Sequence, residues 1–264
     1  MDKILEKMIV AAKAGGEELL KFFGGTGGTF EISQKTGPND LCTDADLASE
    51  KVIMDYLQKH FPEYNIYSEE AGKIDKGSDF TFVVDPLDGT NNFVLGIPYF
   101  CVIIGLEKNK DVLATVIYNP ILDQVYSAIK GQGSFFQDKK LQVNSESDIK
   151  KSTIAFYAAY TIKPDRANAI RGLIQARPAK RLLTNWTVLD FCVLARGKIE
   201  GIVSNDMEYH DILIASFFAK EAGAKITDFS GDIKKGSDLT QAIISNGTKL
   251  HDNLVEMMSQ FKNN

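Results

Sequence analysis

The spacing of hydrophobic residues predicts secondary structure along most of the chain. Apolar residues three or four positions apart are typical of an amphipathic helix, and alternation is typical of a half-buried strand. By these patterns the N-terminal part should contain helices at residues 4–23 and 46–57, strands at 29–33, 65–67 and 81–84, and a polar loop at 35–40. Gly24 and Gly25 would end the first helix, and Thr43 or Asp44 would cap the second.

Three further apolar runs are rich in β-branched side chains: residues 101–107, 112–118 and 124–129. Asn109-Lys110 separates the first two runs and Pro120 lies between the last two, so we expect an antiparallel meander. Residues 130–136 contain two glycines but lack the lysine of a phosphate-binding loop, and we interpret them as a hairpin. The polar stretch 72–79 is interpreted as a mobile loop.

The second half alternates between strand and helix patterns. Strands are expected at residues 153–158, 182–183, 199–203, 226–229 and 242–245, with helices at 164–176, 188–195 and 212–222 and from 249 onward. The polar stretch 147–151 is interpreted as a joint. We therefore expect an α/β (α+β) protein with an N-terminal half, residues 1–147, and a C-terminal half, residues 148–264, joined in one compact unit.

Composition and charge exclude several classes of function. The net charge is −5, so the chain has no basic field to attract nucleic acid or anionic lipid, and neither partner is expected. No apolar run approaches the ~20 residues of a membrane span, which favours a cytoplasmic protein. The cysteines are isolated among apolar residues and are expected to be reduced and buried. His60 and His251 have no neighbouring ligand residues and are interpreted as surface residues.

Candidate chemistry centres on the sequence that follows the strand predicted at 81–84. The strand delivers Asp85 to its C-terminal end, and the proline that follows forces the backbone to turn. The bend would present the carboxylates of Asp85 and Asp88 with the carbonyl of Leu87, an all-oxygen set that suits Mg²⁺. The amides of residues 89–91 could face an anion. A solvated Asp-Pro-x-Asp-Gly turn is the alternative interpretation.

The chain resembles the inositol monophosphatase family, whose first signature is similar to Asp85-Pro86-Leu87-Asp88-Gly89-Thr90-x-Asn92-Phe93. Further similarities are Asp40-Leu41-Cys42-Thr43-x-x-Asp46, the pair Glu69-Glu70 after a strand, and His210-Asp211-Ile212-x-x-Ala215 with Glu221-Ala222-Gly223-Ala224. His210 replaces the tryptophan of the family's second signature. Taken alone, Asp46 and Asp211 would be helix caps, and Glu69 and Glu70 would be surface charges.

The resemblance implies a layered αβαβα sandwich of the inositol monophosphatase and fructose-1,6-bisphosphatase type. It also implies Mg²⁺-dependent hydrolysis of small phosphate monoesters such as inositol 1-phosphate, sensitivity to lithium, and a homodimer. The implied metal ligands are Glu69, rather than Glu70, with Asp85, the Leu87 carbonyl, Asp88 and Asp211. The implied catalytic residues are Asp46, Glu69 and Thr90. The implied contacts of the substrate phosphate are Asp88, Gly89, Thr90 and Asp211.

The resemblance leaves the substrate open. Fructose-1,6-bisphosphatase, histidinol-phosphatase and 3'-phosphonucleotidase activities are alternatives within the superfamily, and the changed residue His210 raises the alternative of a silent binding homologue. Asn185 and Trp186 stand where inositol-phosphate enzymes have small residues, and Ser204 stands where they have a glutamate. Hydroxyls left without partners weaken binding of a polyhydroxylated ring. A small phosphorylated sugar or polyol is therefore the expected partner, accepted with broad selectivity.

Overall fold

The computed structural model describes residues 1–24, 31–34, 41–158, 164–176, 181–205, 209–233 and 241–262. Within these ranges, the side chains of residues 34, 41, 164 and 209–211 are not described. The predicted loop 35–40 and the first residues of the strand predicted at 29–33 lie outside the described residues. The chain divides into two compact units, Met1–Lys139 and Lys140–Asn264.

The first unit is built on a large mixed sheet. Its described helices are α1 (Asp2–Phe22), α2 (Asp44–His60) and α3 (Thr90–Val94). A small antiparallel sheet pairs β1 (Ile32–Gln34) with β2 (Leu41–Thr43). The large sheet has the order β10-β9-β8-β7-β6-β5-β3-β4. Its strands are β3 (Asn65–Ser68), β4 (Gly72–Ile74), β5 (Phe80–Asp88), β6 (Cys101–Lys108), β7 (Asp111–Asn119), β8 (Gln124–Ile129), β9 (Gly133–Phe136) and β10 (Lys139–Lys140).

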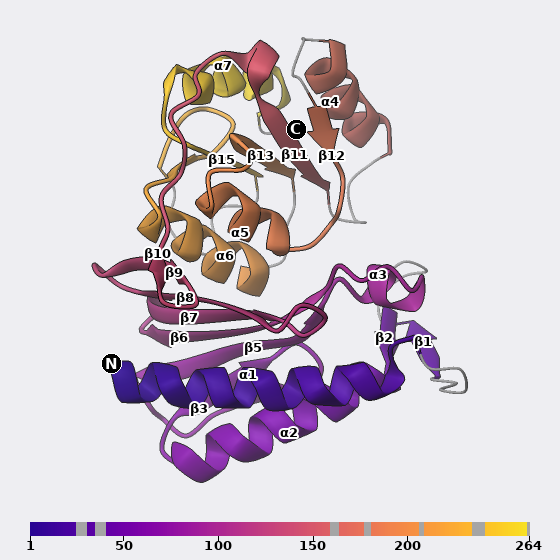
Figure 1. Ribbon diagram of the computed structural model, residues 1–264, viewed down its shortest axis with the longest axis vertical. Coiled ribbons are helices and arrows are strands. Elements are labelled where there is room, and N and C mark those ends of the chain that lie inside the picture. The colour runs from indigo at the N-terminus through magenta and orange to yellow at the C-terminus, as the bar shows by residue number, and fades with distance from the viewer. Residues whose placement is uncertain are drawn as a thin grey trace. The chain divides into compact units, whose positions relative to one another are not determined.

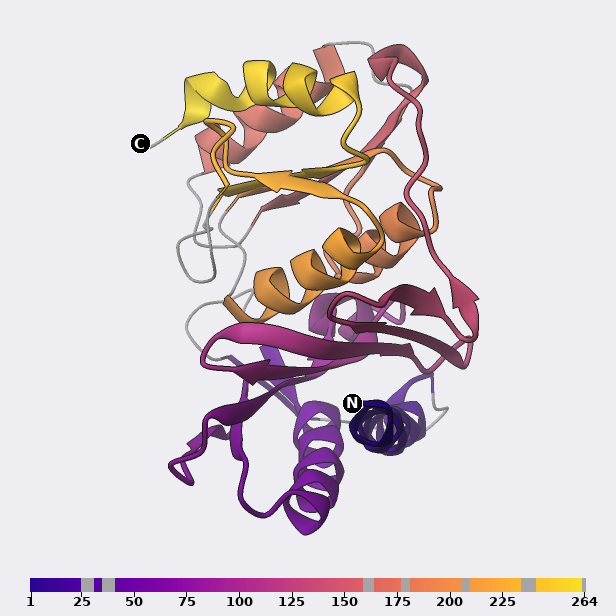
Figure 2. The ribbon, with the colours of Figure 1, turned by 90° about the vertical axis from the view of Figure 1, so that its left-hand side faces the viewer.

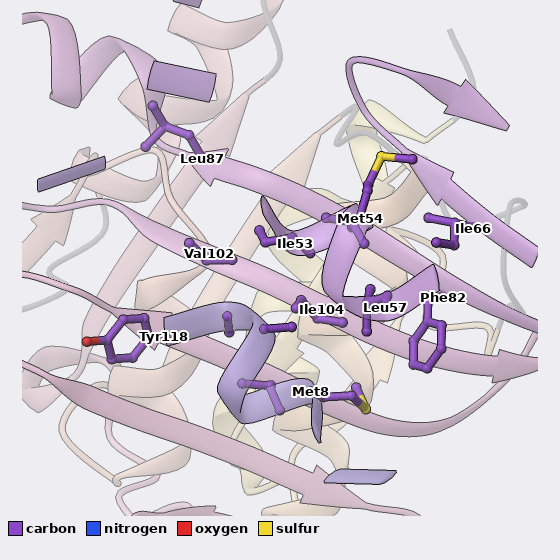
Figure 3. Close-up of a cluster of buried hydrophobic side chains, with 14 of the residues drawn as sticks. Met8, Ile53, Met54, Leu57, Ile66, Phe82, Leu87, Val102, Ile104 and Tyr118 are labelled. Atoms are coloured by element: carbon purple, nitrogen blue, oxygen red, sulfur yellow. The ribbon is translucent and has the colours of Figure 1, made fainter. Parts of the chain in front are cut away.

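Helices α1 and α2 lie along one face of this sheet (Figure 1). The apolar stripe of each helix packs against alternate side chains of β5, β6 and β7, as the helical and strand periods require. Figure 3 shows part of the resulting core, with Met8, Ile53 and Leu57 from the helices and Phe82, Val102 and Ile104 from the sheet.

Gly15 lies where α1 meets α2. A Cβ atom at this position would lie 2.5 Å from Ile53 Cδ1 and 2.8 Å from Ser49 Oγ, both closer than a carbon atom tolerates. Gly15 is also buried. Glycine in the middle of a helix makes the helix less stable than alanine would, but here it permits the two helices to approach each other.

The predicted meander is confirmed, since β6, β7 and β8 pair antiparallel in sequence order. Asn109 and Lys110 have φ values of 51° and 67°, so both central residues of the first hairpin turn are left-handed. Residues 130–136 form the predicted hairpin, because β9 pairs with β8.

Two predictions for this unit are wrong in part. The stretch 72–79 is not entirely a loop, because Gly72–Ile74 forms the edge strand β4 against β3. The strand predicted at 81–84 does not stop at Asp85, because β5 continues to Asp88 despite Pro86. A proline lacks an N–H, but a bulge accommodates it within a strand.

The second unit is a five-stranded sheet with helices on both faces. Its elements are η1 (Ile149–Lys151), β11 (Thr153–Ala158), α4 (Pro164–Ala176), β12 (Arg181–Leu183), α5 (Leu189–Ala195), β13 (Gly201–Asn205), α6 (Tyr209–Glu221), β14 (Lys225–Thr227), β15 (Gln241–Ser245), α7 (Lys249–Met258) and η3 (Ser259–Phe261). The strand order is β12-β11-β13-β15-β14, and β11 is parallel to both of its neighbours. This agrees with the alternating pattern predicted for residues 148–264.

Helices α4 and α7 cover one face of this sheet, and α5 and α6 cover the other (Figure 2). Ile170 and Ile174 of α4 and Leu250 and Leu254 of α7 are buried against Phe156 of β11. No helix in the described part of the chain is both long and apolar enough to cross a lipid bilayer.

The cysteines agree with the prediction, because Cys42, Cys101 and Cys192 are buried and form no disulfide. His60 is exposed, as predicted. The prediction that His251 is a surface residue is wrong, because its side chain is fully buried. An isolated histidine carries no sequence signal of burial, and here the fold supplies two hydroxyl partners for its ring.

The ring nitrogens of His251 lie 2.8 Å from Ser245 Oγ and 3.0 Å from Thr227 Oγ1. Thr227 Oγ1 donates its proton to the Asp228 carbonyl, so Nε2 is the donor to Thr227. In the neutral ring Nδ1 then accepts from Ser245 Oγ. Burial, together with the charge of Lys225, lowers the pKa of His251 to about 4, although Asp252 opposes the shift.

This histidine should make the protein acid-sensitive. A histidine whose pKa is lower in the folded than in the unfolded state does not change the free energy of unfolding when the pH is above its unfolded pKa. As the pH falls below the unfolded pKa, the free energy of unfolding decreases. Between about pH 7 and about pH 5 we expect the free energy of unfolding to fall by about 2 kcal/mol more in the wild type than in His251→Gln. Urea titrations at both pH values would measure this. His60→Gln is the matched control, and an equal loss in the wild type and His251→Gln would contradict the prediction.

Candidate active site

A β-bulge in β5 places the two aspartates of the central motif. Asp85 is aligned with Ile103 of β6 and Asp88 with Cys101, so β5 advances three residues while β6 advances two. Cys101 and Ile103 point to the same face of the sheet because they are two positions apart. The extra residue therefore brings Asp85 and Asp88 to one face, whereas a regular strand would point them to opposite faces. Both aspartates are buried.

Several hydrogen bonds hold this bulge. The amide of Leu87 donates to Asp85 Oδ1 at 2.9 Å, and Ser49 Oγ of α2 donates to the Pro86 carbonyl at 2.9 Å. The thiol of Cys101 donates to Asp88 Oδ2 at 3.3 Å. The orientation of the motif thus depends on neighbouring elements as well as on its own turn sequence.

Glu69 follows the end of β3, beside Asp85. Strand β3 runs parallel to β5 with Ser68 opposite Val84, and the Glu69 amide donates to the Val84 carbonyl at 3.1 Å. The next residues along the two strands are Glu69 and Asp85, so both lie at the carboxyl end of β3, and open sheets commonly bind ligands at the carboxyl ends of parallel strands. Glu69 and Glu70 are both half-buried.

Asp46 caps α2 and also contacts Thr90. Its Oδ2 accepts bonds from the Thr43 amide at 2.8 Å and from Thr43 Oγ1 at 2.5 Å, which makes a capping box at the start of α2. Its Oδ1 lies 3.3 Å from Thr90 Oγ1, which also donates to the Leu87 carbonyl at 3.0 Å. The structure therefore brings together three of the predicted site residues: Asp46, Leu87 and Thr90.

Burial raises the pKa of Asp46 to about 7. The hydrogen bonds from Thr43 oppose this shift, and the carboxylates of Glu70 and Glu69 add to it. A carboxylate with a pKa near neutrality is suited to accept a proton at physiological pH. The contribution of the two glutamates also shows that negative charge gathers on this side of the unit.

Gly89 links the bulge to α3. It has φ 93°, and a Cβ atom there would lie 3.2 Å from the Tyr99 carbonyl, so both the conformation and the space favour glycine. Gly89 precedes the first residue of α3, Thr90. This turn carries the Thr90 hydroxyl toward Asp46.

The second unit carries the residues proposed to select the substrate. Trp186 has φ 58°, which is unusual for a bulky residue, and it follows Asn185, whose Nδ2 donates to Asp190 Oδ1 at 2.8 Å. Ser204 is fully buried near the end of β13. His210 and Asp211 belong to α6, but their side chains lie outside the described residues.

The first unit supplies oxygen donors of the kind that a hard divalent cation prefers. Glu69, Asp85 and Asp88 offer carboxylate oxygens and Leu87 offers a carbonyl, and Mg²⁺ prefers such ligands together with water and phosphate. Among the described residues, no group of three or more His, Cys, Asp or Glu side chains is arranged closely enough to hold a metal ion.

Three residues that contact the site were not predicted from the sequence. Ser49 and Glu50 of α2 and Cys101 of β6 hold the backbone or side chains of the acidic segments. Ser49 and Glu50 lie three and four positions after Asp46, so the helical period places them on the same face. The sequence shows the spacing of Ser49 and Glu50 from Asp46, but it does not show which groups they form hydrogen bonds with.

Comparison with known proteins identifies relatives along the whole chain. A model of the inositol monophosphatase family matches residues 1–262. Inositol-1-monophosphatase of Mesorhizobium japonicum is 32% identical over 232 residues, which cover 86% of each chain. The fructose-1,6-bisphosphatase/inositol-1-monophosphatase of Aquifex aeolicus is 28% identical over 264 residues, 99% of this chain and 97% of the relative. The crystal structure of the extragenic suppressor protein suhB from Bartonella henselae aligns with a TM-score of 0.88 and 29% identity, covering 98% of this chain and 99% of that one. The predicted fold class and family resemblance are thereby confirmed.

Proposed function

The chain belongs to the inositol monophosphatase family, whose members are phosphatases that hydrolyse phosphate monoesters, and we propose that its substrates are small sugar and polyol phosphates. Inositol 1-phosphate would be one of several substrates. We further propose a cytoplasmic homodimer that depends on Mg²⁺ and is inhibited by lithium. The observation that carries the proposed mechanism is the contact between Thr90 Oγ1 and Asp46 Oδ1 beside the acidic bulge.

The proposed metal ligands are the predicted ones: Glu69, Asp85, the Leu87 carbonyl, Asp88 and Asp211. Mg²⁺ bound to these oxygens would act as a Lewis acid, lowering the pKa of a water molecule and offsetting the charge of the substrate phosphate. The family is generally Mg²⁺-dependent, which supports this assignment. The shared face of Asp85 and Asp88 supports it as well.

Asp46 and Thr90 would act on the attacking water. Thr90 Oγ1 would orient the water and Asp46 would accept its proton, as the raised pKa of Asp46 permits. Attack of the water oxygen on phosphorus would form one P–O bond and break the ester P–O bond, and the departing alkoxide would take a proton from solvent water. Asp88, the amides of Gly89 and Thr90, and Asp211 would contact the phosphate.

Substrate choice would depend on the second unit. The buried Ser204 offers a short hydroxyl where inositol-phosphate enzymes have a carboxylate, and Trp186 occupies a segment where they have small residues. Both changes reduce the partners for ring hydroxyls. The Aquifex relative, which is named for two activities, supports fructose 1,6-bisphosphate as a second candidate substrate.

A substrate panel tests this proposal. Phosphate release would be measured with inositol 1-phosphate, fructose 1,6-bisphosphate, histidinol phosphate and a 3'-phosphonucleotide, each with Mg²⁺. We expect the sugar and polyol phosphates to be hydrolysed with kcat/KM values within about a hundredfold of one another. A nucleotide preferred over every sugar phosphate by orders of magnitude would contradict the proposal, and a protein inactive on the whole panel would support the silent homologue.

A further inference from the structure

Glu50 is a buried carboxylate for which the proposed mechanism has no role. It lies on α2 with 6% of its surface exposed, beneath the turn that joins β3 to β4. Burying a carboxylate is unfavourable unless hydrogen bonds compensate for the lost water. Its partners therefore show what the residue does.

Both partners of Glu50 belong to one short turn. Its Oε1 accepts a hydrogen bond from Ser68 Oγ, a very short contact, and a second from the Ala71 amide at 2.8 Å. Ser68 and Ala71 flank Glu69 and Glu70. One oxygen atom thus fixes both ends of the turn that carries these two glutamates.

The same face of α2 holds the other acidic segment as well. Asp46 contacts Thr90, and Ser49 Oγ donates to the Pro86 carbonyl. Ser49 and Glu50 follow Asp46 by three and four residues, which places both on its face of α2. Asp46, Ser49 and Glu50 are all buried. Since a packed helix is rigid, this face sets the position of β5's bulge relative to the turn after β3.

We propose that Glu50 is a positioning residue that holds Glu69 where it can ligate a divalent cation. The inference rests on the proposed function, because it assumes that Glu69 is a metal ligand. Residues that orient metal ligands typically change metal affinity about 10- to 100-fold when they are removed. Glu50 acts through the backbone of the turn and touches neither substrate nor metal.

Three variants test the inference. Glu50→Ala removes the acceptor, and its Mn²⁺ dissociation constant, measured by calorimetry, should rise about tenfold or more. Amide hydrogen exchange in residues 68–72 of the metal-free protein should also become faster. Glu50→Gln keeps an oxygen acceptor at the same position and should restore both readouts to near the wild-type values. Ser68→Ala removes one of the two hydrogen bonds and should give an intermediate result.

Glu200 provides a matched control. It is equally buried, with 8% exposed, and its carboxylate accepts bonds from the Thr153 amide at 2.6 Å and from Asn144 Nδ2 at 2.7 Å, all within the second unit. Glu200→Ala should lower the unfolding temperature as Glu50→Ala does, but leave Mn²⁺ affinity and exchange in residues 68–72 unchanged. Equal losses of Mn²⁺ affinity in both variants would overturn the inference, since global destabilisation would then explain them.

Wild-type exchange and wild-type Mn²⁺ affinity in Glu50→Ala would also overturn the inference. Neither readout uses phosphatase activity. A failure of the proposed substrate class would appear only in the substrate panel, so it can be told apart from a failure of the role of Glu50.

Discussion

Removing divalent cations is expected to abolish phosphate release by this protein. Glu69, Asp85 and Asp88 are the proposed carboxylate ligands of the first unit, and burial together with the charges of Glu70 and Glu69 raises the pKa of Asp46. Without a cation these carboxylates would repel a phosphate monoester and could not stabilise charge in the transition state. Because a bound metal contributes several kcal/mol to such a reaction, we expect the rate to fall by at least about a hundredfold.

The measurement is phosphate release in excess chelator, followed by addition of Mg²⁺ above the chelator concentration. Activity should return on addition, and a parallel assay with chelator already saturated with Mg²⁺ should show no loss. Circular dichroism of the chelated sample would show that it remains folded. Undiminished turnover in excess chelator would rule out the metal mechanism.

Asp88→Asn should lower kcat far more than it changes KM. The substitution keeps the shape of a side chain buried beside Cys101, so the fold should persist, but it removes a charge that the proposed metal site requires. An interaction that is stronger in the transition state than in the ground state affects kcat in this way. We expect a loss of about 10²–10³ in kcat, measured by steady-state kinetics with inositol 1-phosphate.

Two further variants test the same assignment of roles. Thr90→Ala should also reduce kcat, because it removes the hydroxyl between Asp46 and the Leu87 carbonyl. Glu70→Gln should be nearly neutral if Glu69 is the ligand. Near-normal kcat in Asp88→Asn, or a large loss in Glu70→Gln with none in Glu69→Gln, would show that the roles are assigned to the wrong carboxylates.

The sequence predicts the fold best where a period is sustained over many residues. Helix α4 begins at Pro164 and ends at Ala176, as expected from a proline in the first turn and the apolar spacing that follows. The meander was predictable because β-branched runs alternate with turn residues. Short polar edge strands such as β4 and β10 were missed, since a few residues of lysine and glycine carry no periodic signal.

The bulge in β5 shows a different limit. Pro86 is a strong local signal for a turn, and the chain does bend there, yet pairing with β6 carries the strand on to Asp88. Only the partner strand reveals that β5 has one residue more than β6 across this interval. The sequence identifies both aspartates as candidates, but the fact that they share a face depends on tertiary pairing.

Residues defined by their partners were the hardest to predict. His251 and Glu50 look like ordinary surface and helix residues in the sequence, and both are buried because other elements supply hydrogen bonds to them. Asp46 was identified only through a motif, since a helix cap and a catalytic acid have the same local sequence. In the structure the residue caps α2, and its catalytic role is our proposal.

Gly15 shows that the proposed site also constrains α1, a helix that carries none of the proposed site residues. Any side chain at this position would press on Ser49 Oγ, the group that holds the Pro86 carbonyl in the bulge. We therefore expect residue 15 to remain glycine wherever the Asp85–Asp88 motif is kept, although the two are far apart in the sequence. The contact with Ile53 would keep the restriction even in a lineage that lost the chemistry, so a larger residue at position 15 would require changes in α2 as well.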